Sequence, residues 1–272
     1  EAKVEKYYEA PLPAEKMTID MDQWAARMKE ISAVFKNHPG IMKGDAIMIY
    51  TVERRYFVNN EGTEVVQNLP YARIMVFGET KADDGMELPL NLSYFAYDPA
   101  DLPANDKIIA DAKEMVKTLE ALRVAPVVDP YTGPALLSGP ASGVFFHEIF
   151  GHRIEGHRLK GGGETFKKKV GELVLPADFQ VYCDPTLRSY AGEELNGFYL
   201  YDDQGVKARR VDVVKDGILR EFLMSRVPLD GFPHSNGHGR TAGGGDPVSR
   251  QSNLVVETTA PHTEAELRSM LI

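Results

Sequence analysis

Two stretches of the chain repeat apolar residues every three or four positions, which is the spacing of one face of an α-helix. The first covers residues 18–36, where Asp20 or Asp22 can cap its start and His-Pro-Gly at 38–40 ends it. Its apolar face consists of Trp24, Met28, Ile31 and Phe35. The second covers residues 105–123. The pattern therefore predicts two amphipathic helices.

Between these helices, residues 45–79 form short runs rich in β-branched and aromatic residues. The cluster at 59–62, Asn-Asn-Glu-Gly, is typical of a hairpin turn between two such runs. We therefore expect an antiparallel meander flanked by the two helices. Residues 1–125 would form one α+β unit.

A connector rich in Pro and Gly follows at 124–142, and it is the best candidate for a domain boundary. Beyond it, short strand-like runs alternate with turns at 202–205 and 215–217. Residues 231–247 form a long glycine-rich loop, which we interpret as functional. The prediction for 126–272 is a mostly antiparallel β domain carrying one helix, and the whole chain is expected to be α+β.

Charge and composition exclude several classes of protein. Forty acidic residues against 31 basic ones give a net charge of -9, which argues against direct binding of nucleic acid. No apolar stretch approaches the roughly 18–20 residues needed to span a membrane. The single cysteine, Cys183, excludes an intrachain disulfide and is compatible with a reducing compartment, so we expect a cytoplasmic protein.

The pattern H-E-x-x-x-H, formed by His147, Glu148 and His152, is the main candidate for chemistry. In the common H-E-x-x-H zinc signature the two histidines share one helical face. A spacing of five places them about 140° apart on a regular α-helix. Binding one metal ion would therefore require a π-type bulge or a helix end between them, and Gly151 lies where such an irregularity costs least.

If both histidines bind zinc, Glu148 can act as the general base for a water that attacks a peptide carbonyl. The flanking apolar residues would bury most of this helix; they are Val144, Phe145, Phe146, Ile149 and Phe150. The alternative is that the two histidines and the glutamate are only hydrogen-bonded core groups.

Several blocks in one order resemble the TldD/PmbA family of zinc metallopeptidases, also named modulators of DNA gyrase. The blocks are FFHEIFGHRIEGH, GELV, CDPTL, YDDQGVKARRVDVVKDGILREFLMSR, SNGHGR and PVSRQSNLVVE, between residues 142 and 267. Residues before 125 resemble the end of the family's N-terminal domain. The start on Glu1 and the incomplete helix before Ile272 suggest a fragment.

The resemblance implies a peptidase with zinc on His147 and His152 and with Glu148 as the catalytic base. It also implies a third ligand, a cysteine beyond Ile272, and a homodimer or a heterodimer with a family partner. Small or unfolded polypeptides are the expected substrates, since an extended peptide can pair with an open strand edge. The rival interpretations are a non-catalytic scaffold subunit and a regulator that binds a nucleic-acid enzyme.

Five other residues are further candidates for roles at the site. His157 could be a further ligand but is more often an exposed turn residue, and Cys183 is by default a buried inert thiol. Glu155 could orient a ligand histidine. His238 and Arg240, within SNGHGR, are candidates for substrate binding, with glycines beside them that let a peptide approach.

Overall fold

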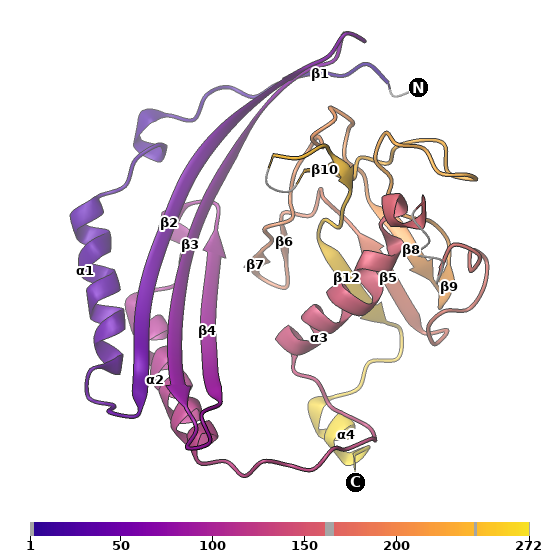
Figure 1. The fold of residues 1–272 in the computed structure, drawn as a ribbon. Coiled ribbons are helices and arrows are strands. Elements are labelled where there is room, and N and C mark those ends of the chain that lie inside the picture. The colour runs from indigo at the N-terminus through magenta and orange to yellow at the C-terminus, as the bar shows by residue number, and fades with distance from the viewer. Residues whose placement is uncertain (1–2, 161–165, 242–243, 272) are drawn as a thin grey trace. The chain divides into compact units, whose positions relative to one another are not determined.

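A computed structural model describes residues 3–160, 166–241 and 244–271. The chain forms two compact units. The sheet-and-helix unit comprises residues 10–54 and 68–131, and the motif unit comprises residues up to 9, residues 55–67 and residues from 132 onward. Mixed helices and several sheets confirm the α+β class (Figure 1).

Long strands dominate the first of these units. β2 (Ile41–Val58) and β3 (Glu64–Lys81) each contain 18 residues, and β4 (Glu87–Ala96) runs antiparallel to β3 from Ala72↔Ala96 to Lys81↔Glu87. Each of these two strands therefore contains two of the short runs expected within residues 45–79. The alternation of side chains between the two faces of the sheet continues from one run to the next. Both long strands extend into the motif unit at their paired ends.

The predicted hairpin turn lies between β2 and β3. The side-chain oxygen of Asn59 accepts hydrogen bonds from the backbone N–H groups of Glu61 at 3.1 Å and Thr63 at 3.0 Å. Gly62 has a φ of +95°, which a residue with a side chain rarely adopts. The strand β1 (Lys6–Tyr8) pairs in parallel with β3 beside this turn.

Both predicted helices are present. α1 (Met21–Ser32) begins at Asp20, whose carboxylate accepts the N–H of Gln23 at 3.0 Å, and a 3-10 turn (Ala33–Phe35) follows it. α2 (Asn105–Arg123) has the predicted bounds. Figure 1 shows both helices along one face of the sheet. They share one apolar core with the strands: Trp24, Ile31, Phe35, Ala72, Ile74, Val76, Ala96, Leu102, Ile108, Ala112, Met115, Val116 and Leu119.

The motif unit contains a four-stranded antiparallel sheet in the order β12-β5-β8-β9. The strands are β5 (Phe179–Cys183), β8 (Val211–Lys215), β9 (Ile218–Leu219) and β12 (Leu254–Thr258). Among the described strands β12 pairs only with β5, so its other edge is open. α3 (Gly139–Phe145) leads into the H-E-x-x-x-H segment.

Shorter elements complete the two units. Two-stranded ribbons are formed by β6 (Ser189–Tyr190) with β7 (Glu193–Glu194) and by β10 (Gly239–Arg240) with β11 (Val248–Ser249). α4 (Glu264–Ser269) opens with a capping box. The remaining helical turns are Ala14–Lys16, Pro99–Asp101, Phe146–Phe150, Gly151–Ile154 and Gly156–Lys160. No helix in the described ranges has the length and apolar character required to cross a bilayer.

Candidate metal centre and cavity

The motif helix changes its winding where the two histidines require it. α3 starts at Ser138, whose hydroxyl accepts the N–H of Ala141, and residues Phe146–Phe150 then form a π-helix. The N–H of Gly151 donates to the carbonyl of Phe146, five residues back. A π-turn places residues five apart on the same face. The irregularity predicted between His147 and His152 is therefore confirmed.

Gly151 is needed for space rather than for backbone freedom. Its φ of -58° and ψ of -44° are ordinary helical values. A Cβ at this position would lie 2.0 Å from the side-chain oxygen of Gln251. The amide nitrogen of Gln251 donates to the carbonyl of His147 at 3.4 Å and lies 3.5 Å from Nδ1 of His152. Gln251, which the sequence analysis missed, thus fills the widened turn.

The π-turn brings three potential metal ligands together. His147, Glu148 and His152 each offer one ligand atom, and these atoms lie within 4.8 Å of one another. Nε2 of each histidine lies 3.8 Å from an oxygen of the Glu148 carboxylate. Ligand atoms around one zinc ion are about 3.3–3.5 Å apart, given metal–ligand bonds of about 2.0–2.2 Å. The nitrogen and oxygen donors are of the types that zinc binds, and their spacing is close to that of a zinc site.

Glu155 orients the second histidine. Its carboxylate is 1% exposed and accepts a hydrogen bond from Nδ1 of His152 at 3.1 Å and another from Nε of Arg158 at 2.6 Å. The guanidinium balances the buried charge, and the bond to Nδ1 fixes the proton there. Nε2 of His152 is then left with its lone pair toward Glu148. This geometry supports the orienting role expected for Glu155.

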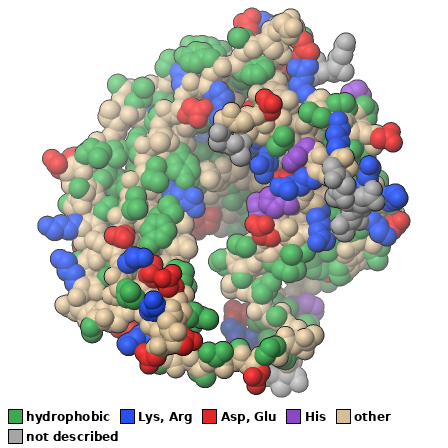
Figure 2. All heavy atoms as spheres, viewed as in Figure 1, with side chains coloured by type: hydrophobic (Ala, Val, Ile, Leu, Met, Phe, Trp, Pro, Cys, Tyr) green, Lys and Arg blue, Asp and Glu red, His purple; other side chains and the backbone are tan. Residues whose placement is uncertain are grey.

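The motif helix is more exposed than expected. Val144 is 63% exposed, Phe145 48% and Ile149 46%, and only Phe150 is part of the core. The expectation of a mostly buried helix was wrong. Apolar residues lie on all sides of this short helix, and only the side that packs against the core is covered. Histidine side chains reach the surface beside basic and acidic ones in the space-filling view (Figure 2). The side chains of His147, Glu148 and His152 are 49%, 60% and 25% exposed, so the potential ligands are accessible.

A cavity of about 810 Å³ adjoins His147. Its walls come from α3, from the segment 195–197 and from the start of β12, with Arg240 at one side. Most of the lining is apolar or backbone, including Phe146, Leu195 and Leu254. A pocket of this size and character is suited to a small molecule or to part of a peptide.

Comparison with known proteins places this geometry in a family. Residues 130–271, more than half of the chain, match the family described as "PmbA/TldA metallopeptidase C-terminal domain". The chain belongs to the PmbA/TldD metallopeptidase family.

Relatives and solved structures agree with this membership. A metalloprotease of Archaeoglobus fulgidus is 31% identical over 56% of this chain and 35% of its own length, and one of Methanothermobacter thermautotrophicus is 27% identical over 74% and 43%. The chain thus spans about a third to less than half of these PmbA/TldD relatives.

Two crystal structures share the fold. The match to a candidate modulator of a DNA gyrase from Thermotoga maritima covers 99% of this chain and 60% of that protein's chain, with a TM-score of 0.71 and 15% identity. The match to TldE from Thermococcus kodakarensis covers 97% of this chain and 58% of the TldE chain, with a TM-score of 0.66 and 18% identity. At these identities the likeness concerns the PmbA/TldD fold alone.

The two residues expected to bind substrate lie in different surroundings in this PmbA/TldD chain. Arg240 lines the cavity. His238 is 0% exposed, with Nδ1 3.2 Å from the carbonyl of Asn236 and Nε2 3.1 Å from the hydroxyl of Ser252. Burial lowers the pKa of His238 to about 4, so the ring is neutral at pH 7. His238 reaches the cavity only through Ser252, which lines it.

Neither of the other two candidates joins the cluster. His157 is not among the described residues that can share a metal ion with His147, and burial lowers the pKa of its ring. Cys183 is completely buried, and this burial raises the pKa of its thiol to about 12. The default interpretation of Cys183 as an inert core thiol is therefore supported.

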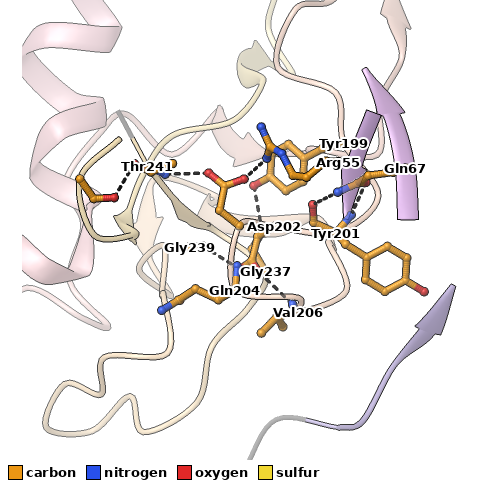
Figure 3. A network of polar contacts seen from close by, with 12 residues as sticks. Arg55, Gln67, Tyr199, Tyr201, Asp202, Gln204, Val206, Gly237, Gly239 and Thr241 are labelled. Carbon is orange, nitrogen blue, oxygen red and sulfur yellow. Dashed lines mark hydrogen bonds and ion pairs between the residues drawn. The ribbon is translucent and has the colours of Figure 1, made fainter. Parts of the chain in front are cut away.

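Asp202, also missed by the sequence analysis, organises the loop that carries Arg240. Its buried carboxylate accepts the backbone N–H groups of Gln204 at 3.0 Å, Val206 at 2.9 Å and Gly239 at 2.8 Å (Figure 3). Desolvation raises the pKa of Asp202 to about 6. The Asp-Asp-Gln-Gly turn was visible in the sequence, but its contact with residue 239 was not.

Proposed function

We propose that this protein is a zinc-dependent peptidase that hydrolyses peptide bonds in small or unfolded polypeptides. The π-helix carries the proposal, because it brings two histidine nitrogens to the same glutamate carboxylate. Membership of a metallopeptidase family and the names of the relatives support it. The chain covers only part of those relatives, so the activity is proposed for the full-length protein.

In this proposal Nε2 of His147 and Nε2 of His152 hold the zinc ion. A bound zinc ion supplies Lewis acidity, polarising the peptide carbonyl and making water a better nucleophile at neutral pH. Glu155 and Arg158 keep the His152 ring aligned, while Gln251 supports the backbone of His147. By resemblance to the family, we propose a cysteine from a segment beyond Ile272 as the third ligand.

Glu148 is proposed as the general base. Its side chain is 60% exposed and lies between the two histidines, 3.8 Å from Nε2 of each. A carboxylate there can accept the proton of the attacking water and deliver it to the leaving amine. A glutamine would keep the shape of this side chain but could not accept the proton.

The open edge of β12 suits an extended peptide. Residues 252–256 line the cavity, and among described strands only β5 pairs with β12. A peptide added along this edge would be bound mainly through its main chain, which an unfolded segment can present and a folded one cannot. Equal cleavage rates for a stably folded protein and its unfolded form would contradict this preference.

We also propose that the working form is a homodimer or a heterodimer with a second family member. The exposed apolar side chains of Val144, Phe145 and Ile149, next to the ligands, are consistent with a covering partner. Sedimentation analysis of the full-length protein, alone and with such a partner, tests this proposal, and a monomer under both conditions would contradict it.

The first experiment measures zinc per chain and peptide hydrolysis in the full-length protein. We expect Glu148→Gln to keep zinc and lose at least about a hundredfold in kcat/KM, the usual scale of general-base catalysis. His147→Ala and His152→Ala should lose zinc, whereas His262→Ala, an exposed histidine outside the cluster, should not. Undiminished hydrolysis by Glu148→Gln would reject its role, and a zinc-free folded protein would favour a scaffold subunit.

A further inference from the structure

We propose that Arg240 binds a carboxylate of the peptide substrate, so that the enzyme prefers peptides with a negative charge at a set distance from the scissile bond. This inference rests on the proposed peptidase function. It names the chemical group that the cavity selects, a carboxylate supplied by the C-terminus of the peptide or by an Asp or Glu side chain.

The guanidinium of Arg240 is held in place by an aromatic ring, and no acidic side chain of the described residues is paired with it. It lies over the ring of Tyr199, 4.7 Å from the ring centroid. That ring is itself fixed, because Tyr199 is 4% exposed and its hydroxyl donates to the carbonyl of Gly237 at 2.8 Å. No ion pair joins Arg240 to an acidic group of the described residues, so the charge is positioned but not neutralised.

The two nearby acids are engaged elsewhere. Asp202 accepts three backbone N–H groups, one of them from Gly239 (Figure 3). Asp203 pairs with Arg55 and accepts the N–H of Thr241 at 2.8 Å. Both carboxylates therefore shape the loop around Arg240 instead of pairing with its guanidinium.

The cavity wall strengthens the case. Arg240 is the one permanently charged side chain among the described residues that line the cavity. The lining amide of Asn253 is occupied, since it donates to the carbonyl of Leu187 at 2.7 Å and accepts the N–H of Gly197 at 2.9 Å. The hydroxyl of Ser252 contacts His238. Arg240 is thus the lining group best able to bind an anion.

The positive charge of Arg240 and its place in the same cavity as His147 define the substrate class. An arginine can bind a carboxylate through two parallel hydrogen bonds, and mostly apolar surroundings strengthen such a pair. His147 lines the same cavity. A peptide carboxylate bound to Arg240 therefore sets how many residues separate that carboxylate from the peptide bond at the proposed zinc site. Amidated neutral peptides lack this anchor.

The test measures binding, not turnover, so it does not depend on the peptidase activity. The full-length protein carrying Glu148→Gln is titrated with N-acetylated hexapeptides of alanine and leucine. The set contains one with a free C-terminus, one with a C-terminal amide, and amidated versions with one Glu or one Gln. We expect the carboxylated peptides to bind about ten- to a hundredfold more tightly than their neutral counterparts.

Adding Arg240→Met should remove this preference while leaving the affinity for the neutral amide within about twofold. Arg210→Met is the matched control, because Arg210 also lies over a tyrosine, 3.5 Å from the ring centroid of Tyr182, but is paired with Asp212 at 2.7 Å and lies outside the cavity lining. It should leave the preference intact. If Arg240→Met loses its fold, Arg240→Gln and Arg240→Lys replace it, with Lys keeping part of the preference.

The peptide set also identifies the source of the carboxylate. Preference for the free C-terminus alone indicates a terminal carboxylate, and preference for the amidated Glu peptide indicates a side chain; either supports the inference. Equal affinities for charged and neutral peptides, or a preference that survives Arg240→Met, would overturn it. If the full-length protein with its native Glu148 hydrolyses none of these peptides while the Arg240-dependent preference is clear, the peptidase function is rejected and the carboxylate site is retained.

Discussion

The interiors of the two units are stabilised by different kinds of side chain. In the sheet-and-helix unit, α1 and α2 cover one face of long strands, and the only buried polar side chain described is Thr80. The other nine described buried polar or charged side chains lie in the motif unit: Thr63, Gln67, Glu155, Asp202, Ser225, Asn236, His238, Ser249 and Asn253.

These polar side chains replace regular strand pairing in the motif unit. Asn236 donates to the carbonyl of Phe222 at 2.7 Å and accepts the N–H of Met224 at 2.8 Å. Gln67 donates to the carbonyl of Tyr201 at 2.9 Å. A loop fixed by such hydrogen bonds can direct several neighbouring side chains into a cavity, whereas side chains on a regular strand must alternate between its two faces. The difference predicts different responses to substitution.

The largest effect is expected in the apolar core. Leu119→Ala, in α2, removes a fully buried side chain and should cost about 2–5 kcal/mol of unfolding free energy. Leu122→Ala, on the exposed side of the same helix, should cost less than about 1 kcal/mol. Denaturant unfolding measures both, and equal losses would contradict the assigned core.

Asn236→Ala tests the polar framework of the other unit. It leaves the N–H of Met224 and the carbonyl of Phe222 without their side-chain partner, and we expect a cost of about 3 kcal/mol. Asn91→Ala, at an exposed position of β4, should be nearly neutral. A loss below about 0.5 kcal/mol for Asn236→Ala would show that water replaces the side chain.

Gly151→Ala should act on the π-turn. The added Cβ would lie 2.0 Å from the Gln251 side chain, so we expect a loss of about 1–3 kcal/mol and weaker zinc binding. Gly143→Ala is the control in α3, because its Cβ would meet no atom within 4 Å, and helix propensity should make it neutral or stabilising. Thermal unfolding and zinc titration compare the two variants.

The smallest net effect concerns pH, because two buried groups act in opposite directions. Desolvation raises the pKa of Asp202 from 3.8 to about 6, so its contribution to stability is present below about pH 3.8 and lost as pH rises through 6. The pKa of His238 falls from 6.5 to about 4, so its contribution is present above about pH 6.5 and lost as pH falls through 4.

Unfolding of Asp202→Asn and His238→Gln at several pH values separates these contributions. The stability of wild type relative to Asp202→Asn should decline from pH 4 to 7, and relative to His238→Gln it should increase. Parallel curves for wild type and a variant would reject the pKa shift of that group.

Local patterns were predictable from the sequence. The helix at 105–123, the Asp20 cap and the turn at 59–62 depend on neighbours within a few residues. An irregularity between the two histidines was predictable, because histidines five apart can share an ion only through a π-type bulge or a helix end between them, and the structure has the π-turn.

Long-range contacts were not predictable in the same way. Gln251 acts on His147 across 104 positions, and Asp202 acts on Gly239 across 37, with no periodic signal linking them. The exposure of the motif helix was mispredicted for a related reason: an apolar helix can be recognised locally, but what covers it cannot. The proposed role of Arg240 likewise depends on Asp202 and Asp203 being occupied by distant partners.

Cys183 makes the motif unit open to a kinetic measurement. It ends β5, an inner strand of the β12-β5-β8-β9 sheet, and it is the single thiol of the sequence. Because the thiol is fully buried and its pKa is raised to about 12, alkylating reagents should modify it only when the sheet transiently opens. The labelling rate therefore reports the frequency of opening, and ligands that bind the closed form should slow it in proportion to their occupancy.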